Sequence, residues 1–161
     1  MKRLFSPWRM PYLGRDKAAE KARGCVFCLA LEQNDSAANL IVHRGQRAFV
    51  ILNRFPYTSG HLMVLPFTHV DQLDGLDAET RGELMELMST ATQVLRKVYR
   101  PQGFNLGANL GAAAGAGIEE HLHLHILPRW AGDTNFISTV GETRVLPETL
   151  EETWQRIKAA W

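Results

Sequence analysis

Three of the six histidines in the chain stand at alternate positions, as His121, His123 and His125. Alternate side chains of a β-strand point to the same face, so this spacing predicts a row of three imidazoles along a strand over residues 121–127. The residues between them are apolar and are expected to face the core. A neutral imidazole is a nucleophile, titrates near neutral pH and binds metals. The row therefore indicates either nucleophilic chemistry or metal binding.

A glycine- and alanine-rich stretch, residues 111–117, precedes the histidines. Main-chain N–H groups without bulky side chains can form a loop that binds anions. A histidine row beside such a loop favours chemistry on a phosphate group, with one imidazole as nucleophile and its neighbours transferring protons. There are two alternatives to this chemistry. The first is a half-exposed strand whose histidines have no chemical role, and the second is a metal-binding site. In a regular strand His121 and His125 lie about 13 Å apart, which argues against one tetrahedral ion shared by all three.

The rest of the chain predicts the elements that must position these residues. Residues 77–100 carry the longest helical pattern, with Asp77 as N-cap and one apolar stripe. Residues 147–161 predict a second, C-terminal helix with one apolar face. Further strands are expected at residues 40–43, 48–52, 61–66 and 104–110. Closely spaced strands around one long helix indicate an α+β fold with an antiparallel sheet.

Length and composition bound the possible functions. A chain of 161 residues is expected to form one domain, divided here into an N-terminal arm over residues 1–24 and a single catalytic domain over residues 25–161. Its net charge of +1 gives no reason to expect binding to nucleic acids or anionic membranes. No apolar run has transmembrane length, and the first residues lack the apolar core of a signal peptide.

The two cysteines, Cys25 and Cys28, stand three residues apart. Such a short loop is a poor disulfide staple, so the pair indicates a metal site or free thiols in a reducing cytoplasm. By itself a Cys-x-x-Cys pair supplies only two of the four ligands of a tetrahedral zinc site. The sequence alone therefore leaves metal binding at this pair open.

Residues 121–127 also follow the pattern His-φ-His-φ-His-φ-φ, where φ is apolar. This pattern resembles the signature of the histidine triad (HIT) family of nucleotide hydrolases and transferases. The resemblance covers about residues 25–140 and includes segments 60–66 and 103–105. The flanking segments look like the bacterial branch near the fragile histidine triad hydrolases and the diadenosine tetraphosphate phosphorylases. The resemblance to the family implies a HIT-like α+β fold and a homodimer in which the two subunits share a ten-stranded sheet.

The resemblance also implies catalytic roles for four histidines. His123 would attack the α-phosphorus and form a nucleotidyl-histidine intermediate, from which water or phosphate releases the nucleotide. His125 would help to neutralise the leaving group, and His121 would brace the strand. His61 would add a fourth imidazole that supports the phosphate pocket. This chemistry implies no catalytic cofactor and no metal at the reacting phosphate.

Substrate and metal ligands are implied in the same way. Asn53 would contact the nucleoside sugar, Asn109 would contact phosphate, and Gly115 and Gly117 would offer main-chain N–H groups. Many relatives have a serine or threonine that touches phosphate where this chain has Gly117. A structural zinc ion would be bound by Cys25, Cys28, His69 and His121.

The function expected is cleavage of dinucleoside polyphosphates such as diadenosine tetraphosphate in the cytoplasm. The alternatives are a diadenosine tetraphosphate phosphorylase, a nucleoside phosphoramidate hydrolase and a non-catalytic nucleotide-binding module. A metalloenzyme that uses the three histidines of the row as ligands is a further alternative.

Overall fold

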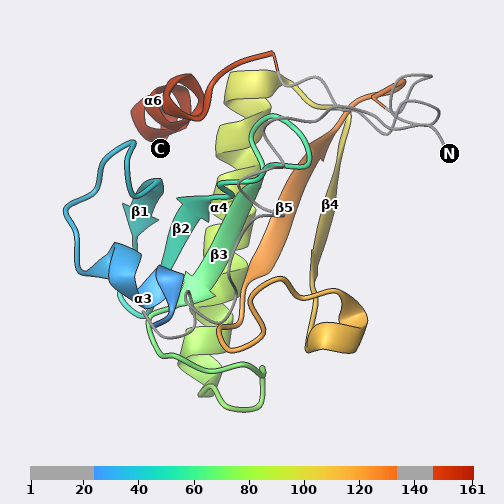
Figure 1. Cartoon of the computed structure of the whole chain (residues 1–161). Coiled ribbons are helices and arrows are strands. Elements are labelled where there is room, and N and C mark those ends of the chain that lie inside the picture. Colours follow the sequence, from blue (N-terminus) through green and yellow to red (C-terminus); the bar gives the residue numbers. More distant parts are fainter. Residues whose placement is uncertain (1–23, 134–146) are drawn as a thin grey trace, which may run out of the picture.

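The computed structural model of the chain describes residues 24–133 and 147–161 (Figure 1). The predicted N-terminal arm, residues 1–24, lies outside the described residues except for Gly24. The described part contains one antiparallel sheet and helices packed around it. The predicted α+β fold is therefore confirmed.

Within the described residues the sheet has five strands in the order β1-β2-β3-β5-β4, and each neighbouring pair is antiparallel. The first three strands follow one another along the chain, whereas β5 inserts between β3 and β4. The histidine-bearing strand therefore has a neighbour on both sides. The strands are β1 (Ile41–Arg44), β2 (Ala48–Leu52), β3 (Leu62–Pro66), β4 (Gly103–Ala108) and β5 (Leu124–Arg129).

The long helix α4 (Ala78–Tyr99) crosses one face of the sheet and contacts β2, β3 and β5 (Figure 1). Asp77 begins it, because its side chain accepts a hydrogen bond from the Thr80 N–H. Arg100 ends it in the left-handed conformation, followed by a proline. The buried residues of α4 include Leu84, Leu87, Met88, Ala91 and Leu95, which confirms the predicted apolar stripe.

The C-terminal helix α6 (Leu150–Ala160) begins with a capping box between Thr149 and Glu152. It contacts α4 and the edge strand β1. The indole N–H of Trp154 donates to the Ile41 carbonyl at 2.9 Å, which ties the helix to β1. The predicted C-terminal helix is therefore confirmed, and it covers one edge of the sheet. The short helices α3 (Val26–Leu31) and η2 (Ala112–Ala114) complete the described elements.

The predicted boundaries of the histidine strand are wrong at both ends. Strand β5 begins at Leu124, and His121 to His123 form an irregular approach to it. The strand also continues through Pro128 to Arg129, beyond the predicted end at residue 127. Strand β3 pairs with β5 only as far as Ile126, so β3 does not need the missing N–H of the proline. Within residues 24–133 and 147–161 no helix has the length and apolar character needed to span a membrane.

Candidate active site

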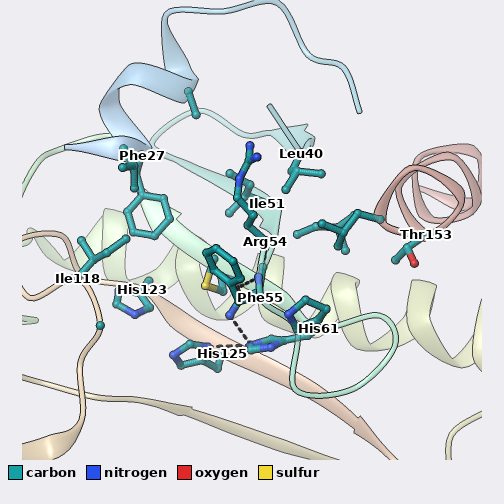
Figure 2. Close-up of a pocket in the computed structure, with 18 of the residues that line it drawn as sticks. Phe27, Leu40, Ile51, Arg54, Phe55, His61, Ile118, His123, His125 and Thr153 are labelled. Atoms are coloured by element: carbon teal, nitrogen blue, oxygen red, sulfur yellow. Dashed lines mark hydrogen bonds between the residues drawn. The ribbon is translucent and has the colours of Figure 1, made fainter. Parts of the chain in front are cut away.

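His61 and His125 form a hydrogen-bonded pair at the junction of β3 and β5. His61 is fully buried, and its Nδ1 accepts a hydrogen bond from the Tyr57 main-chain N–H at 3.1 Å. The proton of the neutral His61 ring is therefore on Nε2, which lies 2.8 Å from Nδ1 of His125. His61 donates this hydrogen bond, so the neutral His125 ring carries its own proton on Nε2 (Figure 2).

His123 presents the opposite nitrogen. Its Nδ1 lies 2.8 Å from the main-chain carbonyl of His121, and a carbonyl can only accept, so Nδ1 carries the proton. The lone pair of the neutral ring is therefore on Nε2. The His123 and His125 ring centroids lie 4.9 Å apart, with the planes nearly perpendicular. A nucleophilic nitrogen thus lies beside a ring that can donate a hydrogen bond.

Burial favours the neutral form of these rings. Desolvation lowers the pKa of His123 below its ordinary value. Desolvation, together with the neighbouring His123, lowers the pKa of His125 to about 4. Both imidazoles are therefore neutral at neutral pH, which is the form that a nucleophile requires.

These histidines line a cavity of about 1100 Å³. Figure 2 shows His123, His125 and His61 along one side of the cavity, with Phe27 near His123. Seven of the residues predicted to act on the substrate line this one cavity: His61, His123, His125, Asn53, Asn109, Gly115 and Gly117. His121 is not among the lining residues.

The two asparagines lie on loops that border the cavity. The Asn53 side-chain oxygen accepts from the Phe55 N–H at 2.9 Å, which fixes the orientation of its amide. The Asn109 amide lies 3.4 Å from the Gly115 carbonyl. Gly115 has a φ of +89°, a conformation that residues with a side chain rarely adopt. The glycine is therefore required to close the loop that follows η2 beside Asn109.

The sequence reasoning missed most of the apolar wall of the cavity, which includes Phe27, Leu40, Ile51, Met63 and Ile118. An apolar wall opposite polar groups is the usual composition of a small-molecule site. Tyr57, which is 46% exposed and lies over His61, was missed as well. Of these missed residues, Phe27 had a signal in the sequence, because it lies between the two cysteines.

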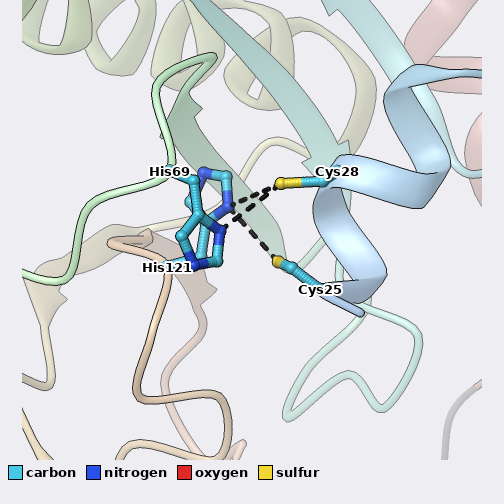
Figure 3. A group of neighbouring side chains, drawn as sticks. All are labelled: Cys25, Cys28, His69 and His121. Carbon is cyan, nitrogen blue, oxygen red and sulfur yellow. Dashed lines mark hydrogen bonds between the residues drawn. The ribbon is translucent and has the colours of Figure 1, made fainter. Parts of the chain in front are cut away.

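A second group of side chains lies next to the cavity, and Figure 3 shows its members converging. Nε2 of His121 donates to the Pro66 carbonyl at 2.9 Å, so the Nδ1 lone pair is left for the cluster. That nitrogen lies 3.4 Å from Sγ of Cys25 and 3.7 Å from Sγ of Cys28. The donor atoms of the group all lie within 4.8 Å of one another. The group, called the Cys/His cluster below, consists of Cys25, Cys28, His69 and His121.

The donor set of the Cys/His cluster fits a zinc ion. Ordinary Zn–S and Zn–N bond lengths in a tetrahedral site place sulfur and nitrogen about 3.6 Å apart. Three of the sulfur–nitrogen distances in the cluster are 3.4, 3.4 and 3.7 Å. Burial and the neighbouring Cys25 raise the pKa of the Cys28 thiol to about 11, so adjacent thiolates require a compensating cation. The predicted set of four ligands is brought together by segments far apart in the sequence.

Comparison with solved structures supports the same fold. A Zn-bound histidine triad family protein from Mycobacterium smegmatis superposes with a TM-score of 0.68 and 27% sequence identity, over 86% of this chain and 94% of that one. The diadenosine triphosphate hydrolase of Plasmodium falciparum superposes with a TM-score of 0.60 at 14% identity, over 84% of this chain and 94% of that one. At that identity the second likeness concerns the fold alone.

Comparison with characterised sequences gives a more similar relative. The AP-4-A phosphorylase of Mycobacterium tuberculosis is 39% identical over 166 aligned positions, which cover 100% of this chain and 85% of the relative. The family model described as the HIT domain matches residues 34–132, more than half of the chain. This segment includes the strands of the sheet and the histidines that line the cavity. The chain belongs to the HIT domain family.

Proposed function

We propose that this chain is an enzyme that cleaves dinucleoside polyphosphates, such as diadenosine tetraphosphate, through a nucleotidyl-histidine intermediate on His123. The observation that carries the proposal is the unprotonated Nε2 of His123 in a ring that lines the cavity. The adjacent His125, with its proton on Nε2, supports it. The similarity to an AP-4-A phosphorylase suggests the substrate class.

In the first step, Nε2 of His123 attacks the α-phosphorus, and the bond between that phosphorus and the bridging oxygen breaks. The leaving nucleotide departs as a phosphate anion, and the Nε2–H of His125 donates a hydrogen bond to its oxygen, while His61 keeps Nδ1 of His125 engaged. Main-chain N–H groups of the loop around Gly115 and Gly117 stabilise the phosphate oxygens. In the second step, water or inorganic phosphate attacks the same phosphorus and releases His123. Because the nucleophile and the group that stabilises the leaving oxygen are both side chains, we expect no catalytic cofactor.

The acceptor in the second step distinguishes a hydrolase from a phosphorylase. Phosphorolysis is suggested by the relative named AP-4-A phosphorylase. Gly117 bears no hydroxyl with which to contact phosphate, so in this chain the loop contributes main-chain groups there. Both acceptors are chemically compatible with a nucleotidyl-histidine.

The test is product analysis of diadenosine tetraphosphate cleavage with and without inorganic phosphate. ATP and AMP in phosphate-free buffer would identify hydrolysis. ATP and ADP that appear only with phosphate would identify phosphorolysis. If neither occurs, an adenosine phosphoramidate is the next substrate. Failure with both substrates, combined with AMP binding, would replace the proposal by a non-catalytic nucleotide-binding module.

We further propose that the Cys/His cluster holds a structural zinc ion. The ligands would be the two thiolates at α3, His69 after β3 and Nδ1 of His121 before β5. When bound, the ion would supply the positive charge that keeps both thiols ionised. Its expected role is to tie α3 to the segment that carries the nucleophile. Free thiols used as ligands fit a reducing compartment, so we propose a cytoplasmic location.

A homodimer and a single catalytic domain over residues 25–161 complete the proposal. Strand β4 is an edge strand, and its Leu106 is 51% exposed. Pairing of β4 with the same strand of a second copy would join two five-stranded sheets into one of ten. Light scattering at micromolar concentration would give twice the monomer mass if this is correct.

A further inference from the structure

Phe27 lies where the Cys/His cluster and the cavity meet. It stands between the two cysteines in α3 and is only 6% exposed. Its ring centroid lies 5.5 Å from that of His121, a cluster member, in an edge-to-face arrangement. The same ring lies 5.6 Å from that of His123, and it lines the cavity (Figure 2). One side chain therefore contacts both groups of histidines and the substrate space.

The main chain of His121 provides a second connection. Its side chain faces the two sulfurs through Nδ1, while its carbonyl accepts the hydrogen bond from Nδ1 of His123. This second hydrogen bond is the one that leaves Nε2 of His123 unprotonated. A displacement of His121 would therefore alter the orientation of His123 and the position of its lone pair.

The segment before β5 is held to the loop after β3 at the same place. The Leu122 N–H donates to the Val70 carbonyl at 2.6 Å, and His69 is the next residue toward β3. Nε2 of His121 donates a hydrogen bond to the carbonyl of Pro66, the last residue of β3. The cluster members His69 and His121 thus belong to two segments that are hydrogen-bonded to each other.

We propose that Phe27 is a positioning residue that couples metal binding at the Cys/His cluster to nucleotide binding in the cavity. The inference rests on the proposed function. A metal ion would fix the relative positions of Cys25, Cys28 and His121, and so of the Phe27 ring held between the cysteines. The ring then holds the cavity wall and His123 in the arrangement that receives the nucleotide. Coupling between two binding sites is reciprocal, so the nucleotide must tighten metal binding by the same factor.

The experiment measures both directions of this coupling in the full chain. AMP affinity is measured by calorimetry on the zinc-loaded and the zinc-free protein. Zinc affinity is measured by competition with a chelator, with and without AMP. We expect zinc to tighten AMP binding about tenfold, and AMP to tighten zinc binding by the same factor. Equal AMP affinity in the two metal states would overturn the proposal.

Two variants separate Phe27 from a general effect of zinc on folding. Phe27→Leu keeps an apolar side chain but removes the ring that contacts both histidines; we expect it to retain zinc and to lose most of the coupling. The matched control is Ile51→Val, which trims the cavity wall on β2, outside the segment that carries the cysteines. It should weaken AMP binding and leave the coupling factor unchanged. Full coupling in Phe27→Leu would overturn the assignment.

Two other results are also decisive. If the zinc-free chain unfolds, the test uses zinc-loaded protein only, and AMP must slow zinc loss to the chelator in the wild type but not in Phe27→Leu. No effect of AMP on zinc loss would contradict the coupling. If AMP binds in neither metal state, the nucleotide site itself is wrong, and the proposed function fails together with the inference.

Discussion

His121 and His123 are two residues apart, but they present opposite nitrogens to their surroundings. His121 donates from Nε2 to the Pro66 carbonyl and leaves Nδ1 facing two sulfurs. His123 donates from Nδ1 to the carbonyl of His121 and leaves Nε2 unprotonated in a ring that lines the cavity. The two regions contain the same side-chain type at similar burial. The carbonyl that each ring meets therefore decides which nitrogen remains available, and with it the chemistry.

The side chains around His121 and around His123 also differ, and each set suits the nitrogen that the ring leaves available. Around His121 the available partners are soft sulfur ligands and another imidazole, a set suited to zinc. Around His123 they are the ring of His125, an apolar wall and a loop of main-chain groups. One region is suited to holding a cation, and the other to reacting with an anion.

The largest effect is expected from a paired comparison of His123→Asn with His121→Asn. Without the imidazole no nucleotidyl-histidine can form, so His123→Asn should lower kcat on diadenosine tetraphosphate by more than about 10³-fold. His121→Asn should instead abolish zinc binding, weaken AMP binding about tenfold, the size of the proposed coupling, and lower kcat far less than His123→Asn does. Steady-state kinetics and metal analysis of both variants test this. Equal losses of activity would remove the distinction between the two histidines.

A smaller effect is expected at His61. His61→Phe keeps a ring at a fully buried position but removes the donor to Nδ1 of His125. With His125 no longer oriented, kcat should fall by about 10²-fold while AMP affinity changes little. The control is His43→Phe, because His43 stacks on Trp161 outside both regions. An unchanged kcat in His61→Phe would show that the His61–His125 pair has no part in stabilising the leaving group.

The pH dependence of activity tests the cavity histidines directly. Burial lowers the pKa of His123 and brings that of His125 from 6.5 to about 4. Protonation of His123 removes its nucleophilic lone pair, and its pKa lies below the ordinary value, so the fall of kcat/KM on acidification should have its midpoint below pH 6.5. The unfolded chain binds more protons than the folded one between the ordinary and the lowered pKa values, so the free energy of unfolding should also decrease there as pH falls. An acidic midpoint at or above 6.5 would contradict the assigned environment.

The smallest effect is expected on thermal stability when the cluster loses a ligand. Cys28→Ser should bind little zinc and unfold at a temperature roughly 5–10 °C lower, as expected for a loss of a few kcal/mol in a chain of this size. A chelator should lower the unfolding temperature of the wild type by a similar amount. The same chelator should have almost no effect on the variant. A wild type whose unfolding temperature does not respond to the chelator would argue against a structural ion.

Local sequence signals were sufficient for the two longer helices, α4 and α6, and for most strands, but not for the short helices α3 and η2. Helix α4 was predictable because its apolar spacing, the Asp77 cap and the proline after Arg100 all agree. The two ends of β5 were not predictable from the sequence. The irregular backbone before Leu124 and the tolerance of Pro128 within the strand both depend on how far β3 pairs with β5. The position of β5 between β3 and β4 results from contacts between segments far apart in the sequence, and the local periodicity does not predict such contacts.

The candidate site was predictable in residue types but not in its organisation. The HIT-like pattern brought out the histidines, both asparagines and the four members of the Cys/His cluster. It did not reveal that His121 and His123 expose different nitrogens, since this depends on two main-chain carbonyls. The part played by Phe27 also required the structure, because its contacts are with residues more than 90 positions away.

The two edges of the sheet differ in a way that limits how the molecule can assemble. Strand β1 is covered by α6, whereas the other edge, β4, carries the exposed Leu106. Among the residues that the structure describes, the sheet has a single open edge, and therefore one place at which another sheet can be added. Pairing through β4 would use that edge in both copies, so growth would stop at two subunits and could not continue into a fibre.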